Sequence, residues 1–181
     1  MMMVSAMLTA PDGSGHKLVG IAAAHCGPLP AGEAAMKPIK AFGPPVMDML
    51  GPIPYSALNG MLDASFPRGA FNFWKSHFIP NLTDEAIDVL VDRFAEAPTP
   101  MCQLLLEHFH GQATRPKIGD TAYALRTTGF NVLILAQWTD RSDDDRCISW
   151  ARQTYTAIQP FVGAIRYVNY LGHEDDPDAA A

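Results

Sequence analysis

Two tyrosines and an asparagine stand close together in the segment Tyr167-Val168-Asn169-Tyr170, near the end of the chain. A phenol takes a proton from a substrate only if its pKa falls from about 10 towards neutrality, which needs hydrogen-bond donors or positive charge beside it. Residues 161–172 are mostly apolar and predict a strand, on which Tyr167 and Asn169 share one face and Tyr170 the other. One phenol can then line a cavity. The alternative is that both tyrosines are core residues whose hydroxyl groups bond to backbone carbonyls or water.

A second group of polar side chains lies on the strand predicted at residues 101–110. Alternation along this strand places Gln103, Leu105, Glu107 and Phe109 on one face, and Leu104, Leu106, His108 and His110 on the other. The spacing His108-x-His110 could hold a metal ion, but the sequence offers no identifiable third ligand. Solvated or hydrogen-bonded histidines are therefore the better interpretation, and we predict no metal site.

The composition favours one compact domain that binds small molecules or protein. The 181 residues are 48% hydrophobic and only 18% charged, which suffices for a real core and leaves few solvated faces. One surface could therefore be built to be covered by a partner. The net charge of −6, without a basic cluster, argues against a nucleic-acid partner.

Cysteine usage and apolar runs indicate a cytoplasmic chain that does not enter a membrane. Cys26, Cys102 and Cys147 are far apart, odd in number and without a CxxC pair, so neither a disulfide framework nor a zinc knuckle is predicted. The apolar segment at residues 1–8 is short and lacks a basic flank, so we interpret it as a first strand and not as a signal peptide. The apolar runs stay below the roughly 18 residues that a membrane span needs.

Several apolar runs predict the strands of an antiparallel sheet. Two runs flank the turn Asp12-Gly13-Ser14-Gly15 and predict a hairpin. These glycines do not predict a phosphate-binding loop, because a strand and not a helix follows them. Residues 71–79 alternate as a strand does, and the continuous apolar run 131–138 predicts a central strand buried on both sides.

Helix signals alternate with these strands. Thr83 predicts the N-cap of a helix whose buried stripe is Ile87, Leu90, Val91 and Phe94. Three aspartates at 143–145 favour the start of another helix, and Pro160 ends it. Residues 43–54 hold four prolines among apolar side chains and predict a packed loop. The order of elements therefore predicts an α+β fold: an antiparallel β-sheet with helices packed on one face.

Five short motifs, in order and at fitting spacing, resemble one protein family over nearly the whole chain. They are Pro54-Tyr55 at a helix start, Phe73-Trp74-Lys75-Ser76, the run Leu104–Gly111, Gln137-Trp138 at a strand end, and Tyr167-Val168-Asn169-Tyr170. The family is the berberine-bridge-enzyme-like FAD-linked oxidases of the vanillyl-alcohol-oxidase flavoprotein superfamily, and the resemblance is to their C-terminal substrate-binding domain. The resemblance implies a sheet, backed by helices, that lies over the flavin with the substrate between them.

The resemblance also implies which residues act. Tyr170 matches the second tyrosine of the family's Tyr-x-Asn-Tyr motif, where the base sits in several members, and Arg166 is a candidate cation near it. In some members of the family this strand carries a catalytic acid or amide, and the matching position here is near Leu105. We therefore expect that the carboxylate has been lost or has moved to Glu107. The alternative role of Glu107 is a salt bridge at the sheet edge. We predict Tyr170 and Glu107 as catalytic residues. The predicted substrate-binding residues are Trp74, Leu105, Phe109 and Asn169.

The sequence departs from the family in lacking the FAD-binding domain, so we expect FAD to be held mainly by a domain or subunit outside this sequence. We predict that residues 1–173 are the substrate-binding portion of an FAD-dependent oxidoreductase, inactive without that domain, and that residues 174–181 are an acidic disordered tail. The expected reaction is oxidation of a small alcohol, sugar or secondary metabolite by hydride transfer to flavin. The alternatives are a flavin-free small-molecule-binding module and an interaction protein that dimerises through its sheet.

Overall fold

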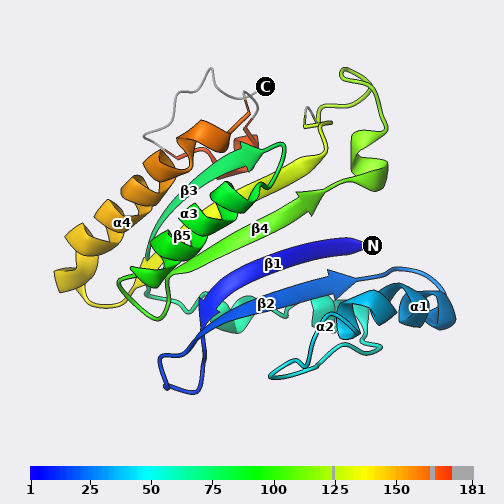
Figure 1. The fold of residues 1–181 in the computed structure, drawn as a ribbon, viewed down its shortest axis with the longest axis horizontal. Helices are drawn as coiled ribbons and strands as arrows, with labels where there is room; N and C mark the ends of the chain where they lie inside the picture. The colour runs from blue at the N-terminus through cyan, green and yellow to red at the C-terminus, as the bar shows by residue number, and fades with distance from the viewer. Residues whose placement is uncertain (124, 164–165, 173–181) are drawn as a thin grey trace.

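The computed structural model describes residues 1–123, 125–163 and 166–172. Figure 1 shows a sheet with helices over one end and further helices beside the strand at the other end. The tail predicted at residues 174–181 lies outside the described residues.

Five strands form one antiparallel sheet in the order β2-β1-β4-β5-β3. The strands are β1 Met2–Thr9, β2 Lys17–Ala24, β3 Phe71–Ile79, β4 Gln103–Phe109 and β5 Gly129–Trp138. The predicted hairpin is β1–β2, and its turn holds Gly13 and Gly15 at φ of 77° and 75°, where glycine is favoured. The predicted central strand, β5, lies between β4 and β3 and is buried along nearly its whole length.

Two helices, α3 Asp84–Ala95 and α4 Asp144–Ala157, cover one face of the β3–β5 part of the sheet (Figure 1). Their apolar side chains and those of the strands share one core: Leu90, Phe94, Cys147, Trp150 and Ala151 from the helices, with Ile79, Leu104, Leu106, Val132, Ile134, Ala136 and Trp138 from the strands. The prediction of an α+β fold with an antiparallel sheet is therefore confirmed.

The start of α3 is as predicted, but its buried stripe is not. The Thr83 hydroxyl accepts a hydrogen bond from the Ala86 amide at 3.3 Å, which is the expected N-cap. Leu90 and Phe94 are buried, whereas Ile87 and Val91 are exposed. Residues 86, 90 and 94, spaced four apart, form the side of the helix that faces the sheet. Ile87 and Val91 therefore point away from it.

The opposite face of the sheet, which we call the far face, is defined by the strand residues that point away from α3 and α4. Leu104 and Ile134 belong to the core beneath the helices, so their neighbours Leu105 and Leu133 point to the far face. By the same alternation the far face holds Asn72, Trp74, Ser76, Phe78, Gln103, Leu105, Glu107, Phe109, Asn131, Leu133, Leu135 and Gln137.

Helices α1 Leu29–Lys40 and α2 Tyr55–Asn59 lie beside β2, away from α3 and α4 (Figure 1). Neither contains a buried residue. The loop between them is exposed, with Val46 at 89% and Met49 at 83%, so the prediction of a packed loop at 43–54 is wrong. None of the helices in the described part of the chain combines the length and apolarity that crossing a bilayer requires.

The strand predicted for residues 161–172 is also wrong, because short 3₁₀ turns form at Gln159–Phe161 and Val168–Tyr170. Beyond the first turn, the Gly163 amide donates to the Phe78 carbonyl at 2.8 Å and ties the chain to the end of β3. The Tyr170 amide donates to the Tyr167 carbonyl at 3.0 Å and closes the second turn. The two tyrosine rings therefore contact each other edge to face, 5.1 Å apart, and do not point to opposite faces.

Candidate functional site

The two residues predicted to be catalytic meet on the far face of the sheet. The Tyr170 hydroxyl donates a hydrogen bond to Glu107 Oε1 at 3.1 Å. Glu107 comes from the middle of the sheet, on β4, and Tyr170 comes from the 3₁₀ turn that crosses this face. Both side chains are partly buried. The contact joins residues that are 63 positions apart in the chain.

The second carboxylate oxygen of Glu107 is held from the neighbouring strand. Asn131 stands directly opposite Glu107 in the β4–β5 register, and its Nδ2 donates to Glu107 Oε2 at 2.8 Å. Asn131 is fully buried, with 0% of its surface exposed. Within the described part of the chain, each oxygen of the carboxylate therefore accepts one hydrogen bond, and the two donors come from different elements.

Tyr167 connects this pair to a group of aromatic side chains. Its ring packs edge to face against Tyr170 at 5.1 Å, Tyr123 at 6.0 Å and Phe109 at 6.2 Å. Its hydroxyl oxygen accepts a hydrogen bond from the exposed Asn169 amide at 2.7 Å. Asn169 thus supports Tyr167, and Phe109 lies under the same cluster.

The electrostatic surroundings keep Tyr170 protonated. Burial raises the pKa of the Tyr170 phenol, and the negative charge and hydrogen bond of Glu107 raise it further. A base of the kind expected from the sequence needs the opposite, a lowered pKa. Arg166, the candidate cation, lies over the ring of Tyr155, 5.7 Å from its centroid. In this arrangement Tyr170 is a hydrogen-bond donor, and its proton already points at an acceptor.

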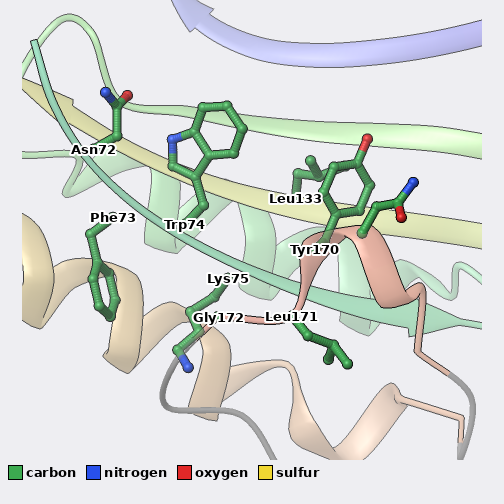
Figure 2. A pocket seen from close by; sticks show the side chains of 9 residues that line it. Asn72, Phe73, Trp74, Lys75, Leu133, Tyr170, Leu171 and Gly172 are labelled. Carbon is green, nitrogen blue, oxygen red and sulfur yellow. The ribbon is translucent and has the colours of Figure 1, made fainter. Parts of the chain in front are cut away.

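A hollow of about 620 Å³ opens beside Tyr170. Figure 2 shows that Trp74, Leu133 and Tyr170 lie on one side of β3, while Phe73 and Lys75 lie on the other. The residues lining the hollow are Asn72, Phe73, Trp74, Lys75, Leu133, Asn169, Tyr170, Leu171 and Gly172. The set includes three predicted site residues: Trp74, Asn169 and Tyr170. Trp74 is 39% exposed, and its ring packs against Phe66 at 5.4 Å.

The remaining predicted residues, Leu105, Glu107 and Phe109, do not line the hollow. Leu105 and Phe109 flank Glu107 on β4 and share its face. The rings of His108 and His110 lie with their centroids 4.4 Å apart and their planes tilted by 37°, and burial lowers the pKa of His108. The described residues contain no group of three or more histidine, cysteine or acidic side chains that could hold a metal ion.

Asn131 and Tyr167 are the site residues that the sequence prediction missed. Asn131 opens the apolar run 131–138, and a carboxamide on a strand predicted to be buried on both sides was the available signal, because buried polar groups need partners. The strand predicted for its segment sets Tyr167 on the face opposite Tyr170, whereas the 3₁₀ turn brings the two rings into contact.

Comparison with known proteins supports the resemblance found in the motifs. No protein-family model matches the chain. A curated FAD-linked oxidoreductase from Dictyostelium discoideum is 25% identical over 132 residues, which are 72% of this chain and 29% of that protein. The solved structure of BBE-like 28 from Arabidopsis thaliana matches 94% of this chain with a TM-score of 0.68 and 18% identity. Berberine bridge enzyme from Eschscholzia californica matches 95% with a TM-score of 0.72 and 17% identity.

The match covers only part of each of these proteins. This chain corresponds to 39% of the Arabidopsis protein and 37% of the Eschscholzia enzyme, so its fold is one portion of theirs. Nearly the whole chain is thus similar to one part of the berberine-bridge-enzyme-like FAD-linked oxidases, which confirms the family resemblance predicted from its motifs.

Proposed function

We propose that this chain is the substrate-binding portion of an FAD-dependent oxidoreductase, in which Tyr170 and Glu107 together remove a proton from the substrate. The observation that carries the proposal is the hydrogen bond from Tyr170, which lines the hollow, to Glu107 on the far face. The similarity to FAD-linked oxidases supports the reaction class. The substrate is a small alcohol, sugar or secondary metabolite that bears a hydroxyl group.

The geometry favours a relay over a free phenolate. Tyr170 lines the hollow and Glu107 does not, so a substrate hydroxyl reaches the Tyr170 oxygen first. As the substrate proton passes to this oxygen, the phenol proton passes along the existing hydrogen bond to Glu107 Oε1. The phenolate is never formed, so the raised pKa of Tyr170 is no obstacle. Glu107 is the final proton acceptor, and Tyr170 is the group that touches the substrate.

Other residues on this face provide the binding surface. The partly exposed indole of Trp74 gives a flat apolar wall, and Leu133 gives the floor beside Tyr170 (Figure 2). Asn169 offers a carboxamide at the rim. Leu105 and Phe109 extend the apolar surface around Glu107. A ring that packs against Trp74 and presents a hydroxyl to Tyr170 fits this arrangement.

FAD fits this chain as a neighbour of the far face and not as a group held by it. Gly13 and Gly15 lie in a hairpin turn that leads into β2, so they do not form a helix N-terminus that could bind its phosphates. The far face, by contrast, offers the Tyr170–Glu107 pair beside apolar side chains. FAD would accept the hydride when it is bound by a separate domain or subunit. We therefore propose an FAD-binding domain or subunit as partner.

Substitution of the two residues in the protein assembled with its flavin-binding part tests the proposal. The assembled protein is mixed anaerobically with a panel of sugars and aromatic alcohols, and flavin reduction is followed by loss of its visible absorbance. Tyr170→Phe and Glu107→Gln are each expected to slow reduction at least about tenfold, because each interrupts the relay. Tyr55→Phe, which lies on the exposed helix α2 and outside the hollow, is the matched control. A loss below about tenfold for Tyr170→Phe would contradict its role.

A second candidate is an interaction protein, and exposed apolar side chains favour it. Val19 and Ile21 on the edge strand β2 are exposed, as are Phe42, Val46, Met47 and Met49 in the loop between α1 and α2. This candidate predicts a stable homodimer of the isolated chain, measured by light scattering, whose formation does not change with Tyr170→Phe. A flavin-free binding module predicts instead that the monomer binds members of the same panel.

A further inference from the structure

Asn131 is a buried polar residue that the relay described above does not use. It lies on β5 between strands on both sides, and none of its surface is exposed. Its Nδ2 donates to Glu107 Oε2 at 2.8 Å. The reverse orientation of the carboxamide would place its oxygen against the carboxylate, where two acceptors repel, so the chemistry fixes the nitrogen on that side.

The other half of this carboxamide has no hydrogen-bond partner in the described part of the chain. Asn131 Oδ1 is buried and accepts no hydrogen bond, and an unmet buried acceptor is unfavourable for folding. The next far-face residue on the strand, Leu133, is apolar and well packed. Packing alone would therefore favour a leucine at 131. Among the residues that the structure describes, the interaction that favours asparagine here is the hydrogen bond to Glu107.

We propose that Asn131 is a positioning residue, which holds Glu107 Oε2 so that Oε1 stays aligned with the Tyr170 hydroxyl. This inference rests on the proposed function, because it assigns a role within the same relay. A glutamate side chain has several rotatable bonds, so one hydrogen bond does not fix its carboxylate. Two donors on opposite oxygens, one from β5 and one from the 3₁₀ turn, do fix it. The proton then has one oxygen to go to.

The other charged and titratable groups named here around Glu107 do not hold its Oε2 atom. Tyr170 contacts Oε1, and Tyr167 and Tyr123 lie in the next layer. Arg126 lies over the Tyr123 ring, 4.8 Å from its centroid. From β1, the residue opposite Glu107 is the apolar Val4. Of these groups, only Tyr170 makes a hydrogen bond to the carboxylate, so among the described residues Asn131 is its second anchor.

The test uses NMR of the full chain, without flavin, and compares Asn131→Leu with Gln137→Leu. Gln137 is a matched control because it is a buried carboxamide on the same face of β5 that bonds to Asn72 at 2.9 Å and not to Glu107. Tyrosines are labelled at the ring carbon that bears the hydroxyl, and Tyr170→Phe assigns the signal. Asn131→Leu is expected to shift the Tyr170 resonance at neutral pH, and Gln137→Leu to leave it in place. An unmoved Tyr170 signal in folded Asn131→Leu overturns the proposal, as does an equal shift in both variants.

A second variant covers the case in which Asn131→Leu does not fold. In Glu107→Gln the carboxylate is gone, so the side-chain amide resonances of Asn131 are expected to move; unchanged resonances overturn the proposal. In the flavin-assembled protein, Asn131→Leu is expected to lower kcat at least about tenfold and to change KM less than about twofold, because Asn131 does not line the hollow. The two proposals can fail separately. If Asn131→Leu shifts the Tyr170 resonance but the flavin-assembled wild-type protein reduces no flavin, the proposed function is refuted and the positioning role of Asn131 stands.

Discussion

Removal of the Tyr170 hydroxyl group tests the hydrogen bond on which the site depends. Tyr170→Phe deletes the donor to Glu107 Oε1 and leaves the ring contact with Tyr167 intact. A hydrogen bond to a charged group contributes about 1.5–3 kcal/mol. Because both side chains are only partly buried, water can replace part of it, and we expect a loss of about 1–2 kcal/mol in the free energy of unfolding. For a chain of this length that corresponds to a fall in Tm of about 2–8 °C.

The assay is urea denaturation of the full chain at pH 7, followed by circular dichroism, with thermal melting as a second measurement. Tyr167→Phe is the matched control, because its hydroxyl accepts a hydrogen bond from the exposed Asn169. We expect that control to lose about 0.5 kcal/mol or less, as exposed neutral hydrogen bonds exchange easily with water. The reasoning is refuted if the two variants lose equal stability with unchanged m-values, since the Glu107 contact would then add nothing.

Three further predictions concern the scaffold. Gly129→Ala should destabilise the chain by about 1–3 kcal/mol in urea, because a Cβ there would lie 2.7 Å from a carbonyl oxygen of β3, whereas Gly43→Ala, with open space around it, should have little effect. Burial and a neighbouring thiol raise the pKa of Cys147 to about 12, so at pH 8 a thiol reagent should modify the exposed Cys26 readily and Cys147 only after unfolding. Thr83→Ala should lower stability by about 1 kcal/mol through loss of the α3 N-cap; no change in urea midpoint would contradict that cap.

Strong local patterns predicted most of the fold. The alternation at 71–79 matches β3, and the cap at Thr83 matches the start of α3. The apolar run at 131–138 falls within β5, which begins two residues earlier, at Gly129. These signals are local because backbone period and side-chain burial act over a few residues. The same patterns did not predict the exposed loop at 43–54, since apolar composition indicates only that a segment can be covered and not what covers it.

The site was harder to predict because two of its contacts depend on tertiary structure. The segment 161–172 is apolar enough for a strand, but the bond from Gly163 to the end of β3 and the turn closed at Tyr170 override that preference. The 3₁₀ turn therefore lies on the far face and directs the Tyr170 phenol toward Glu107. Spacing within the Tyr-x-Asn-Tyr motif could not have revealed this contact.

The placement of Glu107 follows from the energetics of the core. The run from Leu104 to Leu106 is apolar on both faces of β4, so hydrophobic alternation alone does not decide which face meets the helices. A shift of one residue in the register would move Glu107 under α3 and α4, into the core that holds Leu90 and Trp150. Burying a carboxylate there without partners is strongly unfavourable. The observed register instead sets Glu107 opposite Asn131. Because the carboxylate must stay out of the core, it lies on the far face, where the Tyr170 hydroxyl contacts it.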